Sequence, residues 1–279
     1  LLTVGCGILS FFLLPNNVDT ARFLSPAERT FARQRLVQDA PEGSRDSFID
    51  SHKHEAFQWS EVYRGIFNIQ VWLSAAAYFA ILAGLYSFGL FLPTIINAGF
   101  AKDPDAAQLW SVIPYGVACV FTVIVAYASD RLKLRGVLML FCLPVAIVGY
   151  AVIANVHDPK VKYGMTFLMA TGMYSAVPCV LVWNSNNSAG HYKRATTSAL
   201  QLAIANSGGF VATFAYPKAQ GPQFHKGHTE MLGLLVAAWF LVLFNVLHCW
   251  KMNRDKDNGK YDQFLGCGDD RDPNFKMVL

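Results

Sequence analysis

Charged residues are scarce in this chain of 279 residues. Only 15% are Asp, Glu, Lys or Arg, whereas 53% are hydrophobic and the mean hydropathy is +0.30. A water-soluble core of this size does not need so many apolar residues, so the composition excludes an ordinary soluble domain and indicates a membrane protein. Formal charge is absent throughout six long stretches, 70–96, 109–128, 137–154, 163–183, 195–216 and 231–250.

Several functional motifs are also missing. The sequence has no G-x-x-x-x-G-K-[ST], G-x-S-x-G or H-E-x-x-H, which argues against ATP-driven pumping and the common hydrolases. None of its six cysteines forms a C-x-x-C pair, so zinc or disulfide use is not expected. The net charge of +4 indicates no nucleic-acid partner. We therefore expect no enzymatic activity, no cofactor and no metal.

The six uncharged stretches are long enough to be membrane spans. A bilayer core about 30 Å thick takes roughly 20 helical residues to cross, because the helix must satisfy every backbone hydrogen bond internally. We predict an all-α membrane protein with six complete transmembrane helices. Residues 1–14 are apolar but too short to cross, and they lack the features of a signal peptide. We interpret them as the end of a seventh helix, which makes the chain a fragment or a truncated gene product.

The loops predict the orientation. One side of the membrane receives residues 15–67, 129–136, 188–194 and the tail 251–279, with 18 of the 23 Lys and Arg residues. The positive-inside rule makes that side cytoplasmic. The predicted organisation is thus a truncated helix at 1–14, a cytoplasmic central loop at 15–67, a six-helix bundle at 68–250 and a cytoplasmic tail.

The central loop carries two helix signals. Ser25 before Pro26, with Glu28 three residues after the serine, predicts a capped helix that runs to about Asp39. Alternating aromatic and charged residues over 57–66 predict a second amphipathic helix. It either lies on the inner leaflet or docks on the protein, and the pattern does not decide between them.

A short charged hairpin joins the second and third complete spans. Asp130, Arg131 and Arg135 could form an ion pair that exists in only one conformation, or could be ordinary positive-inside charge. The pattern D-R-x-x-x-R-G resembles the cytoplasmic hairpin motif of the major facilitator superfamily. Ala126 and Lys133 stand where that motif usually has glycine. The resemblance implies a conformational gating role for the three charged residues.

The stretch 183–194 resembles a narrower group. W-x-S-N-x-x-G-x-x-K-R is similar to the fungal anion:cation symporter branch, the allantoate and nicotinate permeases. FLSPAER, GLYSFGLFLPTII, G-P-x-F-x-x-G and the tail D-x-N-F-x-M-x-L agree with that branch. The resemblance implies the carboxyl-terminal half of such a transporter, a 3+3 inverted repeat that would work with a missing amino-terminal half of six helices. It adds Asn186, Lys193 and Arg194 to the expected gating residues.

Polar side chains inside the spans are the candidate substrate ligands. No span contains a formal charge, so phenol, hydroxyl and amide groups remain, and they are much less costly to bury than a charge. Each of these side chains alone is also compatible with core packing, and their shared depth on three spans favours a site. The predicted substrate-binding residues, on the first, fourth and fifth complete spans, are Tyr78, Tyr86, Tyr174, Ser175, Gln201 and Asn206.

The resemblance implies a secondary active transporter, a proton-coupled symporter that moves a small organic anion such as a carboxylate, vitamin or ureide by alternating access. We expect a multi-pass protein of the plasma membrane with a cytoplasmic carboxyl terminus. Its partners would be the anion, protons and the lipid bilayer. The alternative is a truncated half-transporter with no independent activity.

Overall fold

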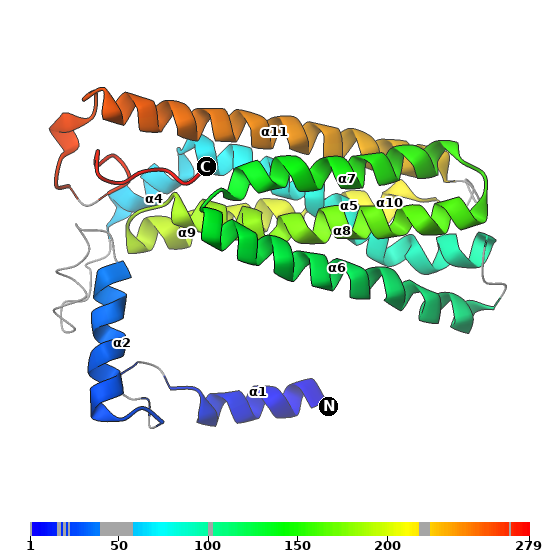
Figure 1. Cartoon of the computed structure of the whole chain (residues 1–279), viewed down its shortest axis with the longest axis horizontal. Coiled ribbons are helices and arrows are strands. Elements are labelled where there is room, and N and C mark those ends of the chain that lie inside the picture. The colour runs from blue at the N-terminus through cyan, green and yellow to red at the C-terminus, as the bar shows by residue number, and fades with distance from the viewer. Residues whose placement is uncertain are drawn as a thin grey trace.

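The computed structural model describes residues 2–15, 18, 21, 23–39, 58–99, 103–217, 224–267 and 269–279, and the regular structure in these ranges is entirely helical (Figure 1). In chain order the helices are α1 (Leu2–Leu13), α2 (Pro26–Asp39), α4 (Trp59–Ile66), α5 (Ile69–Gly99), α6 (Pro104–Leu132), α7 (Arg135–Asn155), α8 (Pro159–Asn186), α9 (His191–Asn206), α10 (Gly208–Ala215), α11 (His225–Asp257) and the short 3-10 helix η4 (Asp262–Phe264).

Five of the described helices are long and apolar enough to cross a membrane: α5, α6, α7, α8 and α11. They coincide with five of the six predicted spans. The remaining predicted span, 195–216, consists of two shorter helices, α9 and α10, which meet at Ser207. The apolar helix α1 has 12 residues and buries none of them.

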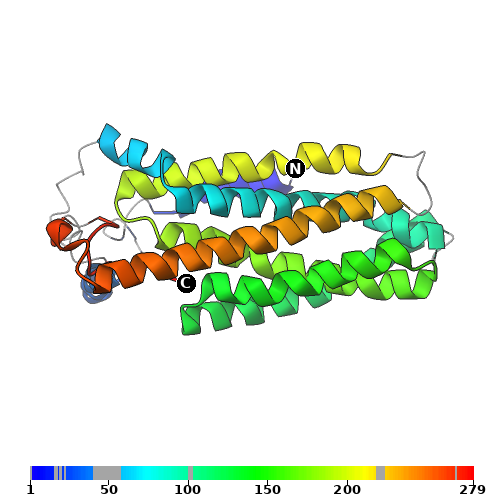
Figure 2. The ribbon, with the colours of Figure 1, turned by 90° about the horizontal axis from the view of Figure 1, so that it is seen from above.

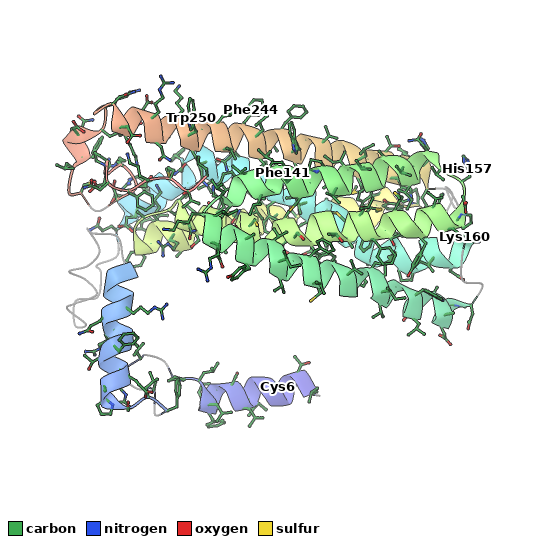
Figure 3. The ribbon with its side chains drawn as sticks, in the orientation of Figure 1. Cys6, Phe141, His157, Lys160, Phe244 and Trp250 are labelled. Atoms are coloured by element: carbon green, nitrogen blue, oxygen red, sulfur yellow. The ribbon has the colours of Figure 1, made fainter. Side chains whose placement is uncertain are left out.

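The spans pack side by side into one bundle. α11 runs between α5 and α7 and contacts both (Figure 2). α5 is the most buried of the five long spans and α6 the least. Figure 3 shows Phe141, Phe244 and Trp250 projecting outward from α7 and α11, where they would face lipid.

Glycine allows the closest helix contact. A Cβ atom built on Gly172 of α8 would lie only 2.6 Å from the Ala146 backbone nitrogen and 2.7 Å from the Cys142 carbonyl oxygen. No larger residue fits without moving α7 and α8 apart. Small residues at such crossings are typical of membrane bundles, where close packing substitutes for a hydrophobic driving force between helices.

The two helices predicted in the central loop are present. At the start of α2 the Glu28 carboxylate accepts hydrogen bonds from the backbone N–H and the hydroxyl of Ser25, both at 2.8 Å. The short α4 docks on α9, because Gly65 is buried against Thr197, while Trp59 and Tyr63 stay exposed. The predicted helix at 57–66 therefore packs on the protein. Residue 57 lies outside the described residues.

Candidate functional site

A polar pair lies on an exposed face of α5 and α9. The Tyr86 hydroxyl, from the middle of α5, donates a hydrogen bond of 2.7 Å to Oδ1 of Asn206, the last residue of α9. Both side chains are exposed, Tyr86 by 38%. The Asn206 amide nitrogen donates to the Leu202 carbonyl at 2.8 Å. Since an asparagine amide has two N–H donors, one donor is still available for a ligand.

The junction between α9 and α10 lies beside this pair. A Cβ atom on Gly208 would lie 2.7 Å from the Phe79 carbonyl oxygen, so glycine lets α10 approach the α5 backbone. Ser207, between the two helices, keeps right-handed helical dihedrals, and Asn206 is the last residue of α9. Leu90 and Phe210, four residues after Tyr86 and Asn206, are exposed apolar side chains.

The other predicted substrate residues lie deeper. Gln201 is buried and its amide donates to the Ser74 hydroxyl at 2.7 Å and to the Val180 carbonyl at 3.2 Å. Tyr78 and Ser175 are buried, and the Ser175 hydroxyl has no hydrogen-bond partner among the described residues. Tyr174 is half-buried with its ring edge-to-face against Tyr115 at 5.8 Å. Of the six residues, Tyr86 and Asn206 are joined by a side-chain hydrogen bond.

At the end of the bundle where α6 joins α7, charged residues of the predicted gating hairpin pair with each other. Asp130 and Arg135 form an ion pair of 2.7 Å across the turn between α6 and α7. Arg131 lies over the Tyr127 ring, 5.3 Å from its centroid, and Nε donates to the Tyr127 hydroxyl. The hairpin charges therefore have partners within the α6–α7 turn and its adjoining helix ends.

The second segment with predicted gating residues binds the carboxyl-terminal tail. The Lys193 ammonium is almost fully buried and lies 2.6 Å from the Asp270 carboxylate, which also pairs with Arg64 at 2.7 Å. Burial lowers the pKa of Lys193, and the adjacent Asp270 carboxylate acts in the opposite direction. Arg194 donates to the Ser188 carbonyl, stabilising the turn from which Lys193 projects. For Asn186 no hydrogen bond to any other described residue is recorded.

Its neighbour Asn187 holds the tail directly. The Asn187 amide accepts from the Val278 N–H at 2.7 Å and donates to the Val278 carbonyl at 3.0 Å. The Trp183 indole donates to the same carbonyl at 2.7 Å. On α11, Asn253 pairs with the Met277 backbone in the same two-point manner. The end of the tail is thus held by side chains at the ends of α8 and α11, where Figure 1 places the carboxyl end.

The two motifs singled out in the sequence meet under the tail. A Cβ atom on Gly136, at the end of the hairpin motif, would lie 2.6 Å from the Trp183 ring. The Gly136 N–H donates to the Leu279 carbonyl oxygen at 3.1 Å. Hairpin, Trp183 and tail are therefore one packed unit. No group of three or more His, Cys, Asp or Glu residues in the described ranges could hold a metal ion.

Comparison with known proteins gives this arrangement a family. Residues 1–213 match the sequence profile described as the Major Facilitator Superfamily. The chain belongs to the major facilitator superfamily. Within this superfamily it is 33% identical over 260 residues to "Uncharacterized transporter C11D3.18C" of Schizosaccharomyces pombe, a match that covers 91% of this chain and 50% of the relative.

Further relatives in the superfamily are fungal as well. "Uncharacterized transporter C1002.16c" of Schizosaccharomyces pombe is 29% identical over 98% of this chain and 54% of its own length. The "High-affinity nicotinic acid transporter" of Saccharomyces cerevisiae is 26% identical over 98% of this chain and 52% of its own length. These matches confirm the suspected fungal branch. The chain spans about half the length of the curated relatives it matches.

One departure from the superfamily motif has a structural counterpart. Lys133 follows the end of α6 with φ +55°, a left-handed conformation in which glycine is normally favoured. The motif's usual glycine at this position would adopt it without steric cost. Lys133 instead contributes a third positive charge to the hairpin, and the turn still closes through the Asp130–Arg135 pair.

Sequence reasoning missed most of the tail-binding residues in this superfamily member. The tail motif D-x-N-F-x-M-x-L was noticed, but nothing in a linear pattern shows that Val278 reaches Asn187, 91 residues away. The one available signal of tail docking is opposite charge: the tail carries Asp269 and Asp270, which pair with Arg64 and Lys193.

Proposed function

We propose that this chain forms the carboxyl-terminal, six-span half of a proton-coupled symporter for a small organic anion. In this proposal α9 and α10 together make the fifth of six spans, the two sets of three spans form an inverted repeat, and the tail is cytoplasmic in the plasma membrane. The chain would work with a second six-helix half, as the length of its relatives suggests.

The exposed pair Tyr86–Asn206 carries the proposal. An amide with a free N–H donor is unfavourable against hydrocarbon, because no partner there satisfies it. The pair lies near the middle of α5, away from both membrane surfaces, and both of its side chains are exposed although α5 is the most buried of the five long spans. This face of α5 and α9 is therefore suited to line an aqueous substrate path closed by further helices.

The chemistry of the pair suits an aromatic carboxylate. The Asn206 amide can donate to a carboxylate oxygen, while the Tyr86 ring offers an aromatic face. One relative is named as a nicotinic acid transporter, and nicotinate has both groups. Tyr78, Tyr174, Ser175 and Gln201 are proposed to act from inside the bundle, by fixing the helices that present this face or by contacting substrate in another conformation.

The cytoplasmic ion pairs suit the gating role. Asp130–Arg135 and Lys193–Asp270 stabilise the present packing of the cytoplasmic ends. A conformational change that separates these charges loses the interaction in one state only, which is how such pairs bias a two-state equilibrium. We propose that Asp130, Arg135 and Lys193 act in this way, and that Arg131, Asn186 and Arg194 take part in gating as neighbours of these pairs.

Uptake of radiolabelled nicotinate into yeast cells that express the full coding sequence tests the proposal. Tyr86→Phe and Asn206→Leu should each lower uptake at equal surface abundance. Thr213→Val is the matched control, since it removes an exposed hydroxyl that bonds only to the Gly209 carbonyl of its own helix. Normal uptake by both site variants would refute the substrate face. Absence of any uptake, with nicotinate or other organic anions, would favour the inactive half-transporter.

A further inference from the structure

A buried histidine lies at the end of the bundle opposite the tail. His228, in the first turn of α11, is 1% exposed, and its Nδ1 is 3.0 Å from the Tyr216 hydroxyl just after α10. The Tyr216 ring stands edge-on to the imidazole at 5.2 Å, and the Tyr150 ring of α7 lies at 6.4 Å. Three helical segments thus enclose one imidazole.

Histidine is the side chain whose unperturbed charge change falls in the physiological pH range. The other described ionisable groups buried near His228 are the phenols of Tyr216 and Tyr150, which titrate far above neutrality in water. Lys162 of α8 and His225 of α11 both disfavour a positive charge on His228. Glu230 of α11 disfavours a negative charge on the Tyr216 phenol. α5 contributes an uncharged side chain to this cluster: the Phe91 ring stacks on the Tyr216 ring with 4.6 Å between the centroids.

We propose that His228 is the group that binds the coupled proton, with Tyr216 as its hydrogen-bond partner. The inference rests on the proposed proton-coupled function. In the present packing the imidazole is neutral, because no carboxylate in the part of the chain that the structure describes contacts it and Lys162 opposes a positive charge there. Protonation therefore favours a state in which this end of the bundle opens and water reaches the imidazolium. With the tail in the cytoplasm, that opening faces the outside.

A contact chain leads from His228 to the substrate face. The Tyr150 hydroxyl donates to the Gly84 carbonyl of α5 at 3.1 Å, two residues before Tyr86. Gly84 is held tightly, since a Cβ atom there would lie 2.9 Å from the Met173 sulfur. Movement of Tyr150 when His228 is protonated is thereby transmitted to the α5 segment that carries Tyr86. An anion bound at Tyr86 and Asn206 also supplies the negative charge that allows the imidazolium to return to the closed bundle.

The first test measures nicotinate uptake together with proton influx at external pH 5 to 7.5, in cells expressing the full coding sequence. His228→Gln should lose both the pH dependence and the proton influx, yet retain exchange of labelled for unlabelled nicotinate, which needs no net proton movement. Tyr216→Phe keeps the ring and should shift the pH profile. His157→Gln is the matched control, an exposed histidine that Figure 3 shows beyond the end of α7.

The outcomes separate the two proposals. Proton-coupled uptake by His228→Gln with an unchanged pH profile overturns the role of His228 and leaves the proposed function standing. Nicotinate uptake without protons in the unaltered protein overturns proton coupling itself. Loss of exchange as well as uptake in His228→Gln indicates a packing role and overturns the proton site.

A second measurement does not depend on the cargo. Nuclear magnetic resonance of the full protein with ring-labelled histidine, in lipid nanodiscs, follows the protonation of His228, assigned by comparison with His228→Gln. The proposal expects a reversible titration between pH 4 and 8 that changes with the Tyr216→Phe substitution. An imidazole that stays neutral throughout this range, in folded protein, would overturn it.

Discussion

Replacing Asn187 with alanine should detach the carboxyl-terminal tail from the cytoplasmic end of the bundle. The Asn187 side chain is fully buried and makes two hydrogen bonds to the Val278 backbone, at 2.7 and 3.0 Å. The substitution removes both. The Val278 carbonyl keeps the Trp183 indole as a partner, whereas no other hydrogen bond is recorded for its N–H.

The magnitude follows from these contacts. Each buried hydrogen bond contributes about 1 kcal/mol net, and a buried donor without a partner costs about 1 to 3 kcal/mol. The docked tail should therefore lose about 2 to 4 kcal/mol relative to the detached tail. Since about 1.4 kcal/mol is a tenfold change in an equilibrium constant, the detached population should rise about thirtyfold or more.

Limited trypsin digestion of purified protein measures that population. The part of the tail after η4 contains two cleavage sites, Arg271 and Lys276, and when opening is fast the cleavage rate follows the open fraction. Asn186→Ala is the matched control, because it removes the neighbouring amide, for which no hydrogen bond to the described residues is recorded. Equal tail cleavage in the two variants would refute the reasoning, and Asn187 would then be no more than a packing residue.

Three further predictions concern packing, pH and gating. Gly172→Val should lower the free energy of unfolding in detergent by about 1 to 3 kcal/mol or more, because the added side chain overpacks the contact of α7 with α8. Gly164→Val is the control, since no atom lies within 4 Å of a Cβ atom built there, and it should cost much less. Equal melting temperatures of the two variants would contradict this prediction. Burial tends to raise the pKa of Asp269, but hydrogen bonds from Arg271 outweigh it and the pKa falls to about 2 from 3.8. Its stabilisation of the tail is thus fully present above about pH 4 and lost as the pH falls through 2. Pepsin sensitivity compared with Asp269→Asn at each pH should show the difference vanish at the acid end, and a constant difference would refute it. Asp130→Asn should lower transport with little loss of stability, because the carboxylate is exposed; unchanged uptake would remove Asp130 from the gating residues.

The sequence predicts the bundle well, because lipid imposes a simple rule. Charge-free stretches of about 20 residues can only be helices, so five spans appear where the hydropathy places them. The capped start of α2 was equally readable, since Ser25 and Glu28 act within one turn. Local patterns and local contacts coincide in both cases.

Long-range contacts were less accessible. The break of the predicted span 195–216 at Ser207 depends on Gly208 packing against Phe79, more than 100 residues earlier, and no periodicity reveals it. Gln201 and Asn206 could not be told apart from the sequence, because both are amide side chains near the middle of the same predicted span. Only the packing shows that Gln201 faces Ser74 inside the bundle while Asn206 faces outward. The same holds for His228, whose partner Tyr216 lies 12 residues earlier, directly after α10.

The most direct measurement asks whether water reaches the flank that carries Tyr86 and Asn206. Single cysteines at these two positions, in full-length protein freed of its other cysteines, are treated with a membrane-impermeant thiol reagent. A third cysteine at Phe244, on the lipid-facing side of α11, is the control. The account predicts rapid labelling at 86 and 206, slowed by nicotinate, and none at 244. Labelling at 86 and 206 as slow as at 244 would contradict a substrate path along this face.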